Sequence, residues 1–352
     1  MTTIDDLQQR FLNIAGLFDE ASLLLDGRSN VIAANEKALA LLGDHITGFP
    51  IDRFLRHPDF AGAVSMALSE GQISTLEYTR VDQVRRAFTL RLAPFDSDHV
   101  LLAIFDSTMM LSVNRIRSDF VANVSHELRS PLTALMGFVE TLQDGAIDDH
   151  DSRDRFLGIM KNEAERMQRL IDDLLSLSQV EAEEHRPPET SVALLPLLEE
   201  MVSAMREKVE KSGKTISINV ADELAQDVLS VKGAPDELRQ VFQNLVENAA
   251  RYGAADSEIK LLVGVGRLAS GQTHQDLLRV QVINQGETIA AEHLARLTER
   301  FYRIDKSRSR QIGGTGLGLA IVKHIVNRHR GRLRITSEDG ETTVSVTLQR
   351  FL

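Results

Sequence analysis

Residues 125–133 read SHELRSPLT, within a segment that has the apolar spacing of a long helix. His126 and Ser130 lie four residues apart, which places them on one helical face. Apolar neighbours such as Leu128 would pack inward and keep His126 on the solvent side. Pro131 removes a helical hydrogen bond and costs about 3 kcal/mol in a helix interior, and we expect it to bend the helix. This cost indicates that something other than stability retains the proline.

Two helices are predicted around this stretch, at 110–142 and at about 152–184, with a short loop between them. Apolar residues in the second recur at close to 3.6-residue spacing. The pair would form a hairpin with a long apolar stripe. A second copy of the chain would cover that stripe in a four-helix bundle.

The residues before the hairpin, 14–108, predict a small α/β module. Apolar runs at 23–25 and 31–33 flank a turn-rich interval, as in a β-hairpin. Asn35 and Gly43 suit the two ends of a helix over 37–42. Strand patterns follow at 76–79, 87–91 and 100–105.

The residues after the hairpin predict one α/β sandwich. A charged stretch with two prolines, 181–190, reads as a linker. Beyond it, helical patterns cover 194–209, 236–252 and 318–328, and strand patterns cover 215–220, 259–265, 278–283, 331–337 and 342–348. Asp339-Gly340 lies between the last two strands and is a strong hairpin turn.

The bulk composition limits the possible classes of protein. A length of 352 residues favours two or three domains, and a net charge of −11 argues against a dedicated nucleic-acid binder. The absence of cysteine excludes disulfides and thiolate metal sites and fits a reducing cytoplasm. No apolar run approaches the ~18 residues of a membrane span, and the first residues do not form a secretory signal. We expect a cytoplasmic chain without a membrane segment, although a longer natural protein would leave an anchor open.

A second polar cluster lies at 244–252, NLVENAARY. Asn244, Glu247, Asn248 and Arg251 recur at offsets of three and four, so they form one stripe of a helix. An amphipathic surface helix would show the same spacing. The chemical interpretation is that amide oxygens, above all that of Asn248, bind Mg²⁺, which prefers hard oxygen ligands.

A glycine-rich stretch, GGTGLGLAIV at 313–322, precedes a helix. Glycines let the backbone approach phosphates closely, and the helix N-terminus supplies free N–H groups and a favourable dipole. Basic residues lie just upstream, which also fits a solvated charged loop: Arg303, Lys306, Arg308 and Arg310.

These stretches, together with ERFYR at 299–303, resemble the phospho-acceptor, asparagine, phenylalanine and glycine boxes of sensor histidine kinases, in the family's order. The resemblance is greatest to kinases of the phosphate-regulon type. It implies a multidomain α/β protein with three parts: a PAS-like sensor module (14–108), a histidine phosphotransfer domain that dimerises as a four-helix bundle (113–184), and an α/β-sandwich ATPase domain of the histidine kinase/chaperone superfamily (193–350).

The resemblance also implies the activity: ATP-dependent phosphorylation of His126, with Glu127 as the base. The phosphoryl group would then pass to an aspartate in the receiver domain of a response regulator. Ser130 stands where the family has a threonine that orients water for phosphatase activity toward that regulator. The residues implied to bind ATP are Asn244, Asn248, Arg251, Tyr252, Asn284, Gly286, Gly314, Gly316, Leu317, Gly318 and Leu319, with Asn248 on Mg²⁺.

Three positions in the nucleotide-binding boxes depart from the family's pattern. Asn284 stands in place of the aspartate that accepts a hydrogen bond from the adenine amino group, Thr288 replaces a glycine, and Arg251 replaces a lysine. An amide oxygen still accepts that bond without charge assistance, at a cost on the order of 1 kcal/mol. We therefore expect weakened but retained ATP binding.

Two alternatives to an active kinase follow from the sequence. A kinase-like signalling scaffold with poor ATP binding would explain Asn284 and Thr288. A chaperone-like ATPase would need no acceptor histidine, so His126 argues against it. In the front module, the absence of cysteine excludes a cysteinyl-flavin adduct. His45 and His57 are better explained as exposed polar residues than as haem ligands, so dimerisation and signal relay are its favoured roles.

Overall fold

A computed structural model describes residues 4–81, 85–224, 229–267, 273–304 and 314–351. The chain divides into two compact units, Met1–Ala122 and Asn123–Leu352. Within the described ranges, no helix has the length and apolar character needed to cross a membrane.

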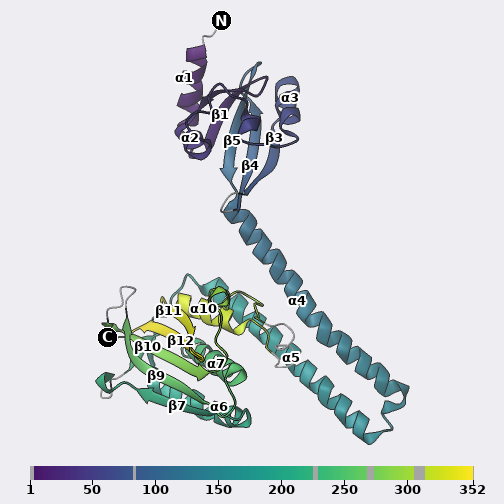
Figure 1. Cartoon of the computed structure of the whole chain (residues 1–352), viewed down its shortest axis with the longest axis vertical. Helices are drawn as coiled ribbons and strands as arrows, with labels where there is room; N and C mark the ends of the chain where they lie inside the picture. Colours follow the sequence, from purple (N-terminus) through teal and green to yellow (C-terminus); the bar gives the residue numbers. More distant parts are fainter. Residues whose placement is uncertain (1–3, 82–84, 225–228, 268–272, 305–313, 352) are drawn as a thin grey trace. The chain divides into compact units, whose positions relative to one another are not determined.

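The first unit is built on a five-stranded antiparallel sheet in the order β2-β1-β5-β4-β3 (Figure 1). Its strands are β1 (Ala21–Asp26), β2 (Val31–Ala34), β3 (Ser74–Val81), β4 (Arg85–Pro94) and β5 (His99–Asp106). Its helices are α1 (Ile4–Ala15), α2 (Glu36–Leu42) and α3 (Phe60–Glu70), with a 3-10 turn at Ile51–Arg53. Three helices and a sheet are consistent with a PAS-like module.

Strand β1 is buried on both faces because helices cover each side of it. Leu23 and Leu25 join the core beneath α2 and α3, whereas Leu24 packs with Phe11 of α1. The sequence patterns did not predict α1 or α3. Helix α3 is rich in alanine and small residues, which weakens its apolar periodicity.

The predicted caps of α2 are confirmed. The Asn35 side chain accepts hydrogen bonds from the Ala38 and Ser22 backbone N–H groups, at 2.9 and 3.0 Å. Gly43 ends the helix with φ +106° and donates its N–H to the Leu39 carbonyl at 2.8 Å. One side chain therefore joins the start of a helix to the first strand.

The predicted helical hairpin is present as α4 (Thr108–Thr141) and α5 (His150–Glu183). Helix α4 continues through Pro131. A π-helical turn at Leu142–Ala146 links the two helices, and Gly145 adopts φ +111° there, which favours glycine. Near the turn, the rings of Phe138 and Phe156 lie 5.4 Å apart between centroids.

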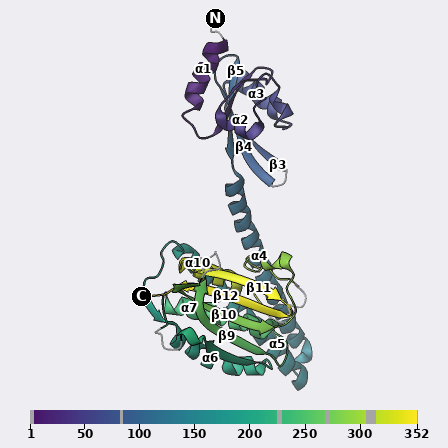
Figure 2. The ribbon, with the colours of Figure 1, turned by 60° about the vertical axis from the view of Figure 1, so that its left-hand side comes forward.

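The rest of the second unit is an α/β sandwich, as predicted (Figure 2). Its sheet has the order β11-β12-β10-β9-β7, antiparallel except for the β7–β9 pair. The strands are β7 (Thr215–Val220), β9 (Glu258–Arg267), β10 (Thr273–Gln285), β11 (Arg332–Glu338) and β12 (Glu341–Gln349). The helices are α6 (Leu194–Lys211), α7 (Pro235–Tyr252), α8 (Ala291–Leu294) and α10 (Gly318–Arg328). A 3-10 turn at Asp222–Leu224 and a two-stranded sheet, β6 (Ser191–Ala193) with β8 (Ser230–Lys232), complete it.

Sequence signals within a few residues of one another account for most of the agreement between predicted and observed elements. The differences arise where an element depends on residues far apart in the sequence. Asp339 and Gly340 both have positive φ, +49° and +79°, as a tight hairpin requires. Helix α5 ends at Glu183, within one residue of the predicted end of the second helix, and so includes the first residues of the predicted linker. Strands β6 and β8 have three residues each, too few for a periodic signal.

Candidate active site

The site is a cavity of about 1330 Å³ between α7, the sheet, the glycine-rich segment and α5. Helix α7 turns its apolar side, including Val241 and Leu245, into the core. Its polar stripe therefore faces the cavity, as the spacing of Asn244, Asn248 and Arg251 predicts.

The structure brings together the predicted nucleotide-binding residues along this cavity. Ten of the eleven line it: Asn244, Asn248, Arg251, Tyr252, Asn284, Gly286, Gly314, Gly316, Gly318 and Leu319. The eleventh, Leu317, has a fully buried side chain and lies at the N-cap of α10, so only its backbone is placed to act.

The glycine-rich segment lies directly against α7 and against the backbone of Phe301. Gly316 has φ +74°, and a Cβ there would lie 3.0 Å from the Phe301 backbone. A Cβ on Gly318 would meet the Asn244 amide oxygen at 3.5 Å. These glycines therefore leave a backbone cradle at the N-terminus of α10, suited to phosphate.

Asn244 has an orphaned polar atom inside the site. Its side-chain nitrogen is buried and makes no hydrogen bond within the described structure. With Asn248 beside it on the cavity wall, the donor set fits a nucleotide with a hard divalent cation. No cluster of three or more His, Asp or Glu able to hold a metal occurs among the described residues, so Mg²⁺ would depend on phosphate oxygens as well as Asn248.

Helix α5 contributes an acidic residue that the sequence patterns did not single out. The Thr315 hydroxyl of the glycine-rich segment donates a hydrogen bond to the Asp173 carboxylate at 2.7 Å. Burial raises the pKa of Asp173, and the nearby Glu247 raises it further, while Thr315, Arg169 and Arg251 oppose the change. A carboxylate thus lies beside the loop that is suited to phosphate.

Arg303 brings positive charge to the same cavity. Burial lowers the pKa of its guanidinium, and the electrostatic influence of Tyr252 and Glu127 opposes the change. Its Nε and Nη2 atoms are buried without hydrogen bonds in the described structure. The basic residues Lys306, Arg308 and Arg310 upstream of the glycine-rich stretch, and Gly313 within it, lie outside the described residues.

Two further departures from the family's pattern, Asn284 and Thr288, lie at the end of β10 and just after it. Asn284 lines the cavity and is 9% exposed. The Thr288 hydroxyl accepts a hydrogen bond from the Gly340 N–H at 2.9 Å, so this threonine holds the β11–β12 turn against the segment that follows β10. Its presence therefore has a structural explanation.

The predicted acceptor residues lie on α4, outside the cavity lining. His126 and Ser130 are exposed, as expected from their shared helical face. Glu127 accepts a hydrogen bond from Arg166 of α5 at 3.1 Å, and the Arg166 side chain is only 14% exposed. The sequence patterns missed Arg166, because its pairing depends on the register of the two helices.

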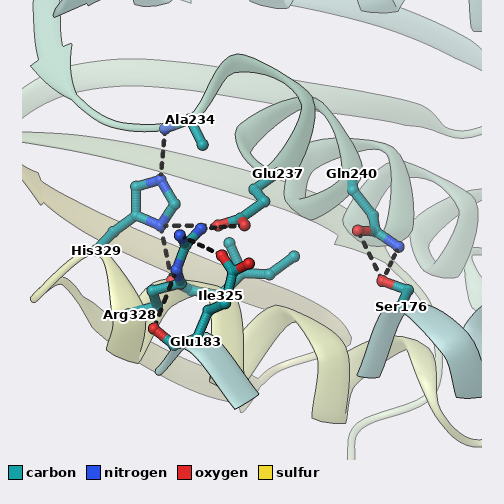
Figure 3. A network of polar contacts seen from close by, with 8 residues as sticks. All are labelled: Ser176, Glu183, Ala234, Glu237, Gln240, Ile325, Arg328 and His329. Atoms are coloured by element: carbon teal, nitrogen blue, oxygen red, sulfur yellow. Dashed lines mark hydrogen bonds and ion pairs between the residues drawn. The ribbon is translucent and has the colours of Figure 1, made fainter. Parts of the chain in front are cut away.

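A polar network joins the end of α5 to α7 and α10 (Figure 3). Arg328 contacts Glu183 of α5 at 2.6 Å and Glu237 of α7 on its other side. About two turns before Glu183, the Ser176 hydroxyl pairs with the Gln240 amide at 2.8 to 3.0 Å. The same region of α5 also supplies partners for His324, which lies within 3.1 Å of Glu184.

His329 belongs to this network, and its side chain is fully buried (Figure 3). Its Nδ1 donates to the Ile325 carbonyl at 2.8 Å, and its Nε2 accepts from the Ala234 N–H at the start of α7, at 3.0 Å. Burial lowers the pKa of His329, although the Ile325 carbonyl and Glu237 oppose the change. These contacts select one neutral tautomer.

Comparison with known families gives two matches, both C-terminal to the first module. Residues 116–183 match the His Kinase A (phospho-acceptor) domain. Residues 233–351 match the histidine kinase-, DNA gyrase B- and HSP90-like ATPase.

Curated relatives and solved structures agree with these matches. The phosphate regulon sensor protein PhoR of Pseudomonas aeruginosa is 35% identical over 96% of this chain, which spans 72% of PhoR. The sensor protein kinase WalK of Staphylococcus saprophyticus is 29% identical over 97% of this chain, which spans 55% of WalK. Among solved structures, histidine kinase ThkA in complex with the response regulator protein TrrA matches 96% of this chain and 98% of its own, with a TM-score of 0.51 and 20% identity.

Proposed function

The chain belongs to the sensor histidine kinases of two-component signalling, and from that premise we propose that it transfers the γ-phosphoryl group of ATP to His126. The phosphoryl group then passes to an aspartate in the receiver domain of a response regulator. The enzyme is a protein-histidine kinase of the phosphate-regulon type. The observation that carries the proposal is an exposed histidine beside a carboxylate, in the same unit as a glycine-lined cavity suited to ATP.

In the proposed reaction, a neutral His126 imidazole attacks the γ-phosphorus while the bond to the ADP oxygen breaks. Glu127 accepts the proton from the other ring nitrogen, so the phosphohistidine stays neutral at the ring. In the resting enzyme the Arg166 guanidinium pairs with the carboxylate of Glu127, the residue that follows the histidine. ADP leaves with the electron pair of the broken bond.

The cavity residues position the nucleotide for this step. Backbone N–H groups around Gly314 and Gly316 and the N-terminus of α10 bind the phosphates, and Arg251 and Arg303 add positive charge. Asn248 would hold Mg²⁺, which when bound neutralises charge on the phosphates. Asn244 supports Asn248 from the preceding turn of α7.

His126 does not line the cavity, so phosphorylation needs a movement of the ATP-binding part toward α4. Such closure steps are common in phosphoryl transfer and are often slower than the chemistry. The polar contacts between α5 and the ATP-binding part would break during that movement.

The remaining assignments complete the proposal. Residues 14–108 form a PAS-like module for dimerisation and relay, 113–184 the phosphotransfer domain and 193–350 the catalytic domain. The chain acts in the cytoplasm as a homodimer, in which two hairpins bury their apolar stripes as a four-helix bundle. Ser130, on the same face as His126, orients water when the enzyme removes phosphate from the regulator.

The test is incubation of the chain with γ-labelled ATP and Mg²⁺. We expect acid-labile, base-stable label on the wild type and on His185→Gln, an exposed-histidine control, but none on His126→Gln. Label that persists in His126→Gln would assign the acceptor elsewhere. No label on a folded, dimeric wild type would favour a signalling scaffold instead.

A further inference from the structure

The floor of the nucleotide cavity carries one buried amide among apolar side chains. Ile335, Val344 and Val282 lie opposite one another on β11, β12 and β10, and all three line the cavity. Asn284 and its cross-strand partner Thr342 form the next row on the same face, which also lines it. An apolar sheet with one polar group suits a flat base whose edge must be read.

The Asn284 side chain has hydrogen-bonding capacity to spare. It is 91% buried, and its Nδ2 reaches only the Gln285 carbonyl, at 3.4 Å. That carbonyl already accepts a bond from the Ala254 N–H at 2.7 Å. Its Oδ1 has no hydrogen-bond partner among the described residues. A ligand in the cavity that hydrogen-bonds this amide therefore gains affinity.

The amide can face the ligand in either orientation. A half-turn about its last side-chain bond exchanges Oδ1 and Nδ2, and this torsion is broad and nearly two-fold. The half-turn gives up only the 3.4 Å contact, which is longer than a good hydrogen bond. The side chain is therefore able to offer the base an acceptor or a donor.

The two classes of purine differ at the edge that such a group reads. Adenine has an amino donor at C6 and an acceptor at N1, whereas guanine and hypoxanthine have an oxygen acceptor at C6 and an N–H donor at N1. A carboxylate only accepts, so opposite the C6 substituent it would bind the amino group of adenine and repel the oxygen of a 6-oxopurine. An amide complements both.

We propose that Asn284 makes this site accept 6-oxopurine nucleoside triphosphates, GTP and ITP, as well as ATP. The inference rests on the proposed function, because that function puts a nucleoside triphosphate in the cavity that this sheet lines. Asn284 is the specificity-determining residue, and its loss of charge broadens the substrate class in addition to weakening ATP binding.

Equilibrium binding of ATP, ITP and GTP with Mg²⁺ to the full chain tests the inference without requiring any phosphoryl transfer. The variants are Asn284→Asp and, as a matched control, Asn219→Asp, which adds the same charge at an exposed position on β7. ITP lacks the 2-amino group of GTP, so it reports on the C6 edge alone. Labelling from γ-labelled GTP and ITP follows on the same proteins.

We expect the wild type and Asn219→Asp to bind ATP and ITP within about tenfold of each other. Asn284→Asp should raise the preference for ATP over ITP, as the ratio of their binding affinities, by at least tenfold, a change of about 1.4 kcal/mol. An unchanged ratio in Asn284→Asp, or a wild type that binds ATP alone, overturns the inference. Binding of all three nucleotides without any labelled His126 would instead contradict the proposed kinase activity.

Discussion

His329 shows how one buried side chain organises the ATP-binding part of the chain. Its two ring nitrogens join the end of α10 to the first N–H groups of α7, which carries Asn244 and Asn248. A Cβ on Gly233 would lie 3.1 Å from the His329 ring, so the imidazole fills the space beside the chain that enters α7. Protonation would place a second N–H opposite the Ala234 N–H and break this contact.

His329 therefore predicts a pH-dependent stability. Burial lowers its pKa in the folded chain, whereas an unfolded histidine titrates at about 6.5. The unfolded state binds the proton more readily, so this contribution to stability is complete above about pH 6.5 and is lost as the pH falls toward the folded-state pKa. Glu237 and Arg328 face the same ring: Glu237 raises the pKa of His329 and Arg328 lowers it. The net change, with both charges present, is a lowered pKa.

Urea denaturation at pH 7.5 and 5.5 measures this contribution. We expect the wild type to lose stability at the lower pH and His329→Gln, whose amide oxygen accepts from Ala234, to lose clearly less. His185→Gln, at an exposed site, should behave as the wild type. Equal pH dependence in the wild type and His329→Gln would assign the loss to other groups.

At the scale of elements, α5 belongs both to the helical hairpin and to the wall of the nucleotide cavity. Leu170 and Leu177 are buried, and the polar residues between them, Asp173 and Ser176, contact the glycine-rich segment and α7. The Asp173 carboxylate therefore competes with nucleotide phosphates for the loop that contains Thr315. Docking of α5 and binding of ATP are opposed through this residue.

Removing the Asp173 charge should strengthen nucleotide binding. Asp173→Asn keeps an oxygen that accepts from Thr315 but removes like-charge repulsion of the phosphates, so we expect ATP to bind about threefold tighter or more. Asp172→Asn is the matched control, since Asp172 lines the same cavity but is exposed. Calorimetric titration with ATP measures both. An equal gain in ATP affinity in the two variants would mean that the effect comes from the net charge of the cavity and not from Asp173 itself.

At the scale of the whole molecule, the hairpin leaves apolar surface that one chain does not cover. Several large apolar side chains on α4 and α5 are 40% exposed or more: Val121, Leu132, Met136, Val139, Leu157, Ile171 and Leu175. An apolar stripe of this length on two adjacent helices is typical of half a four-helix bundle. A second copy of the hairpin would bury it.

A charge in this stripe should dissociate the proposed dimer. Met136→Glu would bury an unpaired carboxylate between the hairpins, so we expect at least a tenfold weaker dimer by analytical ultracentrifugation. Met66→Glu carries the same change on α3, where Met66 is also exposed. A dimer that persists in Met136→Glu and dissociates in Met66→Glu would place the interface in the first unit instead.

Much of the architecture follows from local patterns. Apolar periodicity identified α5, α6, α7 and α10, and the Asn35 and Gly43 caps identified α2, because capping and amphipathicity act within a few turns of chain. The same patterns placed the cavity-lining side chains of α7 on one face. Helices α1 and α3 and the short β6–β8 pair had no such signal.

By itself the sequence determined the type of each long element and the polar stripes and glycines that line the cavity, since these depend on neighbours close along the chain. Only the tertiary structure decided which distant groups meet. Thr315 and Asp173 are 142 residues apart and Arg328 and Glu183 are 145 apart, yet each pair is hydrogen-bonded. The burial of the Asn284 amide likewise depends on the packing around it. The physical reason is that burial and pairing are set by helix register and sheet packing, which no local pattern encodes.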